Sequence, residues 1–134
     1  MSLRHPKVLA WELRLKAVFD GIDEELERKY ANRFPLHPAR AKHGDTANRE
    51  DDGLFDLGAA FSAGYGSEFG SGYSVQIRVA TLKQIPAEFI RAIEEEIVIR
   101  LTKELPRAFP GRDLRVVREG HAFKIIGDLS LGTV

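Results

Sequence analysis

The strongest constraint on the fold is the stretch from Gly53 to Thr81, where apolar residues alternate with small or polar ones. A period of two over this length is typical of strands that have one buried face. The two alternating halves are joined by a glycine-rich turn over residues 66–72, so the stretch predicts a β-hairpin. Its apolar side is formed by Phe55, Leu57, Ala59, Phe61, Ala63 and Tyr65, and then by Tyr73, Val75, Ile77, Val79 and Thr81.

Two other stretches have the period of an amphipathic helix, with apolar residues at steps of three and four. The first runs from Lys7 to about Tyr30, and the second runs from Pro86 to about Leu105. Pro106 is expected to limit the second helix, because proline lacks the amide proton that a helix interior uses.

The last part of the chain predicts a second hairpin, with strands at Leu114–Arg118 and His121–Ile126 and Gly120 at the turn. The predicted element order is therefore αββαββ. The fold class is α+β: a two-layer sandwich with a four-stranded antiparallel-type sheet and two helices on one face. A chain of 134 residues suits a single domain over 1–134.

This order of elements resembles that of a ferredoxin-like domain whose first strand has been moved to the end of the chain. The resemblance is one of element order alone. If the strands are numbered along the chain, it implies the spatial order 3-4-2-1, with the two strands of each hairpin adjacent to one another.

The composition excludes several classes of function. Twenty basic residues balance twenty acidic ones, so no net charge attracts nucleic acid or a membrane surface. The chain has no cysteine, which excludes disulfides, a thiolate nucleophile and cysteine-ligated zinc. No apolar run approaches the roughly 20 residues that span a bilayer, and the N-terminus does not resemble a signal peptide. A cytoplasmic protein is expected.

The reverse face of the first hairpin carries small, mostly neutral side chains where a solvated sheet would carry larger polar ones. We expect this face to be covered, either by the loop over residues 33–53 or by a second subunit, which favours a homodimer. The alternative is that the face is open. It offers no aromatic platform, which argues against the RNA-binding chemistry of ferredoxin-like domains. The predicted interface residues are Gly58, Ala60, Ser62, Ser74, Gln76 and Arg78.

The loop over residues 33–53 is long and lacks periodicity, and such loops are often functional or partner-bound. His37, His43 and Asp45 are of the residue types that bind zinc, iron or manganese, and the acidic run 50–52 follows them. Their spacing matches no standard motif, so neither a metal nor another cofactor is predicted. The alternative is that the histidines make ordinary hydrogen bonds within the loop.

An anionic ligand is a further possibility for this region. The loop carries a basic cluster, and Glu68 and Phe69 in the glycine-rich turn could contribute to the same site. The turn itself is a poor match to a phosphate-binding loop, because it joins a strand to a strand and lacks the Lys-Ser/Thr ending. The cluster consists of His37, Arg40, Lys42 and His43.

These features favour a self-associating binding or structural module that has no catalytic activity of its own. The rival is an enzyme or a protein that binds a small ligand or metal, with a site built from the 33–53 loop and the 66–72 turn. No nucleophile is marked by its context, so no catalytic residue is assigned. Nucleic-acid binding through Arg40, Lys42 and Arg78 ranks third, because the charge is balanced and the aromatics are missing.

Overall fold

The computed structural model describes residues 6–48, 52–63, 70–120 and 122–127. It contains two helices and one sheet of four strands, so the predicted α+β class and the order αββαββ are confirmed. The elements are α1 (Pro6–Tyr30), the 3-10 turn η1 (Ala31–Arg33), β1 (Phe55–Ser62), β2 (Gly72–Val79), α2 (Ala87–Ala108), β3 (Leu114–Glu119) and β4 (Ala122–Gly127).

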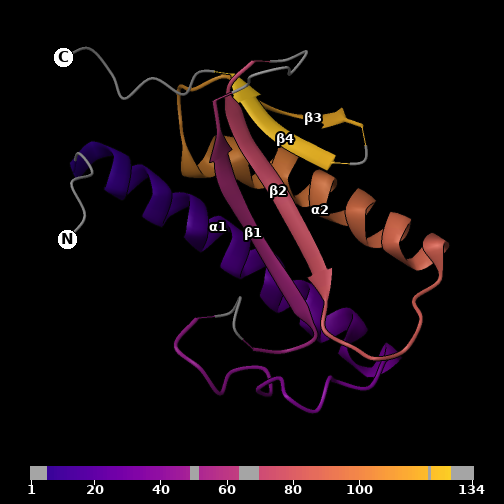
Figure 1. Ribbon diagram of the computed structural model, residues 1–134. Helices are drawn as coiled ribbons and strands as arrows, with labels where there is room; N and C mark the ends of the chain where they lie inside the picture. The colour runs from indigo at the N-terminus through magenta and orange to yellow at the C-terminus, as the bar shows by residue number, and fades with distance from the viewer. Residues whose placement is uncertain (1–5, 49–51, 64–69, 121, 128–134) are drawn as a thin grey trace.

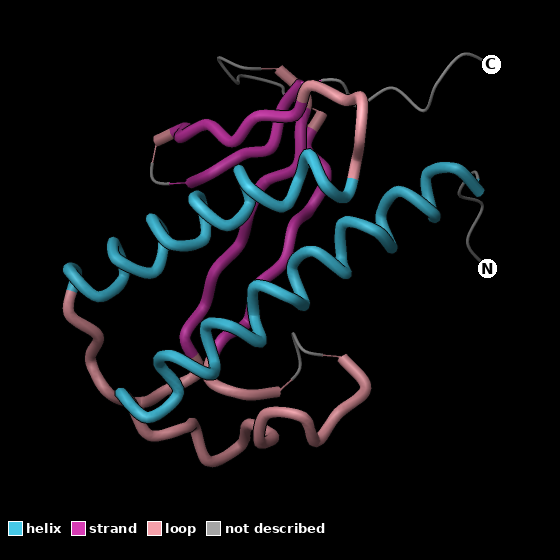
Figure 2. Tube along the Cα trace, turned by 180° about the vertical axis from the view of Figure 1, so that it is seen from behind, coloured by secondary structure: helices cyan, strands magenta, loops and turns pink. Residues whose placement is uncertain are grey.

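The sheet is antiparallel throughout, and its order is β1-β2-β4-β3. This is the predicted spatial order read from the opposite edge. Both helices lie against one face of the sheet, behind the strands in Figure 1 and in front of them in Figure 2. β1 and β3 are therefore the two edge strands.

The core lies between the two helices and the sheet. The apolar side of β1 and β2 faces the helices, as the alternation predicts: Leu57 and Val75 are buried there, as is Ile125 from β4. Leu15 on α1 and Ile97 on α2 lie in the same cluster. Each such side chain contributes on the order of 2 kcal/mol through the apolar area that it removes from water.

Helix α2 continues past Pro106 to Ala108, so the expectation that this proline limits the helix is wrong. The fixed φ of proline is itself helical, and within the last turn it removes only one backbone hydrogen bond. The amide of Phe109 donates to the carbonyl of Leu105 and closes the helix end.

The second hairpin turns at Gly120, which has the predicted positive φ of 63°. The described second strand begins at Ala122, and His121, where the sequence predicts its start, lies outside the described residues. In the first hairpin, the described strands end at Ser62 and resume at Gly72.

The 33–53 loop lies at the end of the β1–β2 hairpin where β2 finishes, at the bottom of Figure 1. The amide of His37 donates to the carbonyl of Ala80 (2.8 Å), and the Thr81 hydroxyl donates to the carbonyl of Pro35 (2.6 Å). Ala60 and Gln76 on the reverse face of the hairpin are exposed, so the loop does not cover the small-residue face at these positions.

Among the described residues, neither helix is long and apolar enough to cross a membrane.

Candidate metal centre

Helix α1 carries a line of charged side chains beside its apolar stripe. The residues follow one another at steps of four, four, three and four, so they occupy one flank of the helix. This flank faces the outer edge of β1, and we refer to it as the α1 ridge. It consists of Glu12, Lys16, Asp20, Asp23 and Glu27.

The C-terminal end of the ridge is buried. Asp23 is 1% exposed and Glu27 is 5% exposed, although a carboxylate that close to the core loses most of its hydration. Oε1 of Glu27 accepts a hydrogen bond from the amide of Phe55 (2.9 Å) and so holds the start of β1. Neither oxygen of Asp23 has a hydrogen-bond partner in the described part of the chain.

The backbone next to Glu27 has to be glycine. Gly53 has φ +76°, which disfavours any side chain. A Cβ added there would lie 2.3 Å from Oε1 of Glu27, well inside van der Waals contact. Gly53 therefore lets the chain pass directly beside the buried carboxylate.

The 33–53 loop brings a third carboxylate to the same place. Asp52 is fully buried, and its Oδ2 accepts hydrogen bonds from the amide (3.0 Å) and the hydroxyl (2.8 Å) of Thr46. Two features hold this part of the loop: a β-bridge between Ala41 and Asp52, and the guanidinium of Arg40. Arg40 donates to the backbone carbonyls of Asp52, Gly53 and Phe55.

His43 completes the group from the outer side. Its Nε2 lies 3.0 Å from Oε2 of Glu24, which fixes the orientation of the ring. Its Nδ1 points inward, 3.5 Å from Oδ1 of Asp52 and 4.0 Å from Oδ1 of Asp23, and it is buried without a hydrogen bond to any described residue. One ligand atom from each of Asp23, Glu27 and His43 lies within 4.8 Å of the others.

The electrostatics follow from this crowding. Burial, together with the charges of Glu27, Asp52 and Asp20, raises the pKa of Asp23 to about 8, although His43 opposes the shift. Burial disfavours the charged form of His43, but the hydrogen bond to Glu24 and the charges of Glu24, Glu27 and Asp23 outweigh it and raise the pKa of the imidazole. The protonated form of Asp23 and the charged form of His43 are therefore both favoured.

The residue types present are those that bind a divalent metal. Three carboxylates and one imidazole nitrogen are ligands for zinc, manganese or iron. Because Nε2 is held by Glu24, a neutral His43 would present the lone pair of Nδ1 to an ion, and a carboxylate behind a histidine ligand is a common arrangement in metal sites. Asp23, Glu27 and His43 could therefore hold one metal ion, and Asp52 lies beside them, with its Oδ1 3.5 Å from Nδ1 of His43.

The structure brings only some of the predicted site residues together. His43 lies in the cluster, whereas Asp45 is exposed and its amide donates to the carbonyl of Lys42, which is also exposed. His37 lies apart from the cluster, in an open cleft of about 470 Å³ that Arg40 and Arg78 also line. Glu68 and Phe69 lie outside the described residues.

The predicted interface residues lie on the sheet face that is turned away from the helices. Ala60 and Gln76 are exposed there, and Gly58, Ser62 and Ser74 are half-buried. Arg78 is also exposed and pairs with Asp56 across the β1–β2 ladder (3.5 Å).

Sequence reasoning missed Asp23 and Glu27. Their positions in the sequence could have indicated that they are buried. Asp23 directly follows the core residue Ile22, Glu27 directly follows the core residue Leu26, and the two are four residues apart. Two acidic residues at this spacing against an apolar stripe share one face that is turned toward the interior. Their burial nevertheless depends on where the distant loop lies.

Comparisons with known proteins place the chain in a family. A family model described as "Uncharacterised protein" matches residues 6–127, a range that contains the whole cluster. A Borreliella burgdorferi protein, described as "Uncharacterized protein", is 37% identical over 106 residues, which cover 79% of this chain and 83% of that protein. No solved structure matches the chain. The chain therefore belongs to this family of uncharacterised proteins.

Proposed function

We propose that the protein binds one divalent transition-metal ion between α1 and the 33–53 loop, with Asp23, Glu27, His43 and Asp52 as ligands. The observation that carries the proposal is Asp23. This carboxylate is 1% exposed, neither of its oxygens accepts a hydrogen bond from a described residue, and it faces two further ligand types within 4.8 Å.

A buried carboxylate without donors is costly unless a positive charge compensates it. No described Lys or Arg lies within ion-pair distance of Asp23 or Glu27, and Arg40 is directed at backbone carbonyls instead. A bound cation would supply the missing charge. The imidazole ligand favours zinc, manganese or iron(II) over magnesium and calcium, which prefer oxygen ligands.

Four protein ligands are typical of a structural metal site, in which no position is kept open for a substrate. Two ligands come from one helix and two from the loop, so the ion would tie the loop to the helix. This fits the other fixed points of the loop, at Ala80 and Thr81. The proposed function is therefore a binding module whose loop is held by a metal ion.

The direct test is a calorimetric titration of chelator-treated protein with Zn²⁺ and with Mn²⁺, together with metal analysis of protein purified without chelator. We expect one ion per chain and a rise in the melting temperature when the ion binds. Magnesium and calcium should bind much more weakly. The variants Glu27→Gln and His43→Gln should each lose at least about tenfold in affinity, because each removes a ligand.

Asp20→Asn is the matched control, because Asp20 lies on the same ridge but pairs with Lys16 (2.9 Å) outside the cluster. It should keep the affinity of the wild type. The proposal is wrong if neither Zn²⁺ nor Mn²⁺ binds with a stoichiometry of one, or if Glu27→Gln and His43→Gln bind as tightly as Asp20→Asn.

A further inference from the structure

β1 is an edge strand of the described sheet. No described strand pairs with β1 on the side away from β2. The amide of Ala80 donates to the carbonyl of Leu54 across the ladder, and hydrogen-bonded positions alternate along an antiparallel strand. The backbone groups that point outward are therefore those of Phe55, Leu57, Ala59 and Phe61.

Phe55 supports this assignment of outward-pointing residues, because its amide and carbonyl already have partners outside the sheet. Its amide donates to Glu27, and its carbonyl accepts from Arg40. The outward groups of Leu57, Ala59 and Phe61 have no partner strand among the described residues. Residues 57–62 contain no charge and no proline, the devices by which edge strands usually avoid pairing. The other edge strand, β3, carries Arg115, Arg118 and Glu119.

Helix α1 extends beyond this edge. Figures 1 and 2 both show its N-terminal half continuing past β1, where no strand of the sheet lies over it. The flank of α1 on this side carries Leu9 (47% exposed) and Leu13 (58% exposed), and it adjoins Glu12. Phe61 on β1 is 60% exposed and contacts Tyr73, whose hydroxyl donates a hydrogen bond to Oε2 of Glu12 (3.2 Å).

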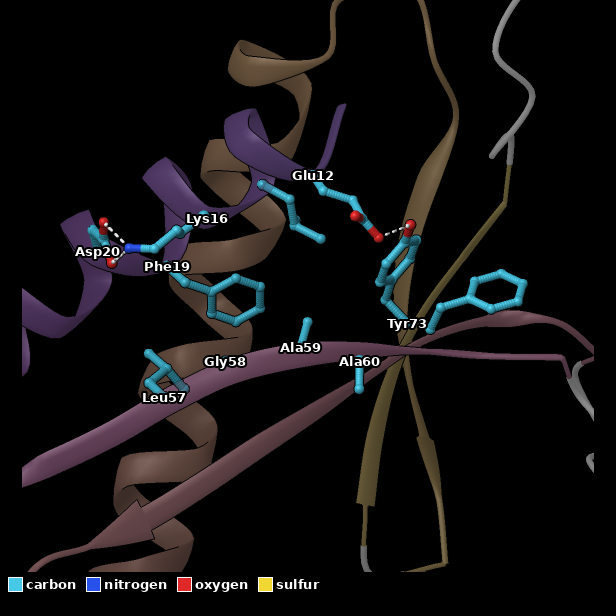
Figure 3. Close-up of a pocket in the computed structure, with 11 residues that line it drawn as sticks. Glu12, Lys16, Phe19, Asp20, Leu57, Gly58, Ala59, Ala60 and Tyr73 are labelled. Carbon is cyan, nitrogen blue, oxygen red and sulfur yellow. Dashed lines mark hydrogen bonds and ion pairs between the residues drawn. The ribbon is translucent and has the colours of Figure 1, made fainter. Parts of the chain in front are cut away.

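A cleft of about 450 Å³ separates the helix from the strand. Its floor is apolar, with Leu15, Phe19 and Leu57, and its rim is polar. Figure 3 shows Lys16 and Asp20 paired on α1, with Ala59 and Ala60 on the strand opposite. The small side chain of Ala59, which points toward the helix (Figure 3), leaves this space open. A fifth strand added at the edge would therefore be covered by the exposed flank of α1.

We propose that this edge pairs with the β1 edge of a second copy of the chain, in antiparallel register about a two-fold axis. Antiparallel strand addition requires outward-pointing residues to pair with outward-pointing residues. With Ala59 opposite Ala59 of the partner subunit, Leu57 lies opposite Phe61 of the partner subunit. Each exposed Phe61 then enters the cleft of the other copy.

A second copy fits this surface better than an arbitrary peptide. The occupant has to present apolar side chains at alternate positions to α1 and carry no charge along the edge, and β1 itself has this pattern at Leu57, Ala59 and Phe61. The chain has a formal net charge of zero, so two copies do not repel one another. The pairing would join two four-stranded sheets into one, with all four helices on the same face.

The test is the mass in solution, measured by sedimentation equilibrium with the full-length protein as purified, at concentrations up to about 1 mM. The wild type should have twice the monomer mass of 15.0 kDa. Phe61→Lys should weaken the dimer at least about tenfold, because a lysine at the edge opposes pairing. Phe61 is exposed in the single chain, so circular dichroism should show an intact fold.

Two controls separate this surface from others. Leu82→Lys changes an equally exposed apolar residue away from the cleft (73% exposed) and should leave the dimer intact. Gln76→Arg places a charge on the open sheet face and should also have no effect. A strictly monomeric wild type overturns the proposal. So does a Phe61→Lys dimer as tight as the wild type, or a Gln76→Arg variant that dissociates, which would assign the interface to the sheet face.

Discussion

Both ends of the α1 ridge carry carboxylates, but the surroundings of these carboxylates differ. At the N-terminal end, Asp20 is about one-third exposed and forms an ion pair with Lys16, beside an open cleft. At the C-terminal end, the 33–53 loop covers Asp23 and Glu27, and Asp23 receives no hydrogen bond from a described residue. This difference supports the proposal that a metal ion compensates the buried end.

A second carboxylate sharpens this comparison. Glu96 on α2 is also well shielded, but Lys29 (2.6 Å), Tyr30 (2.7 Å) and Arg100 (3.0 Å) all donate to it. Burial disfavours its charged form, yet these three hydrogen bonds outweigh burial and lower the pKa of Glu96. Glu96 thus has its donors within the described residues, whereas no described residue donates to Asp23.

The largest expected effect is that of Gly53→Ala. The new Cβ would have to displace the Glu27 carboxylate while the backbone keeps a positive φ, so we expect a loss of about 3 to 5 kcal/mol in the free energy of unfolding and loss of metal binding. Gly70→Ala is the matched control, because Gly70 has nearly the same φ (+77°) and no atom within 4 Å of the added Cβ. It should cost about 1 kcal/mol. Equal losses in urea denaturation would contradict the close approach at Glu27.

The next effect is the pH dependence of the metal-free protein. Folded Asp23 keeps its proton up to a pKa of about 8, whereas an unfolded aspartate loses it near 3.8. Between these values the folded state binds more protons, so the free energy of unfolding should fall as the pH rises, by about 4 kcal/mol between pH 5 and pH 8. The raised pKa of His43 acts in the same direction above pH 6.5.

Urea denaturation of chelator-treated protein between pH 5 and 8 measures this slope. Saturating zinc should reverse it, because the ion replaces the proton on Asp23. A metal-free protein whose stability rises with pH over this range would contradict the account of the cluster.

Glu96→Gln should destabilise the protein, and by less than the two changes above. The substitution keeps the shape of the side chain but removes the charge that Lys29 and Arg100 contact, so we expect a loss of about 2 kcal/mol in the free energy of unfolding. Metal affinity should not change, because Glu96 lies outside the cluster. Thermal and urea denaturation check the first expectation, and calorimetric titration checks the second. A stabilising effect would mean that Glu96 is no better compensated than Asp23.

The fold could be predicted from the sequence because its signals are local. Alternation over Gly53–Thr81 and helical spacing in α1 and α2 each report one buried face, and the αββαββ order then restricts the sheet to few arrangements. The error at Pro106 arose because a proline in a last turn costs only one hydrogen bond.

The candidate metal centre could be predicted only in part. His43 and the acidic end of the loop were recognised as ligand types, but Asp23 and Glu27 read as two acidic residues among many on a charged helix. Their burial arises from a non-periodic loop that folds back over α1, and nothing in a local pattern reports which helical residues a distant loop will cover. The exposed edge of β1 could not be predicted either. Its exposure depends on where α1 lies relative to the sheet, which no local pattern reports.

The most direct test of the need for an outside cation compares the stability of the wild type with that of Asp23→Asn at pH 8, with and without saturating Zn²⁺. Without metal, the asparagine variant should be the more stable protein, because it no longer buries a charge that lacks donors. With zinc, the wild type should become the more stable one, because only it has the full ligand set. Asp20→Asn should leave both values within about 0.5 kcal/mol of the wild type. If Asp23→Asn is less stable than the wild type under both conditions, and by the same amount, the cluster does not require a metal ion.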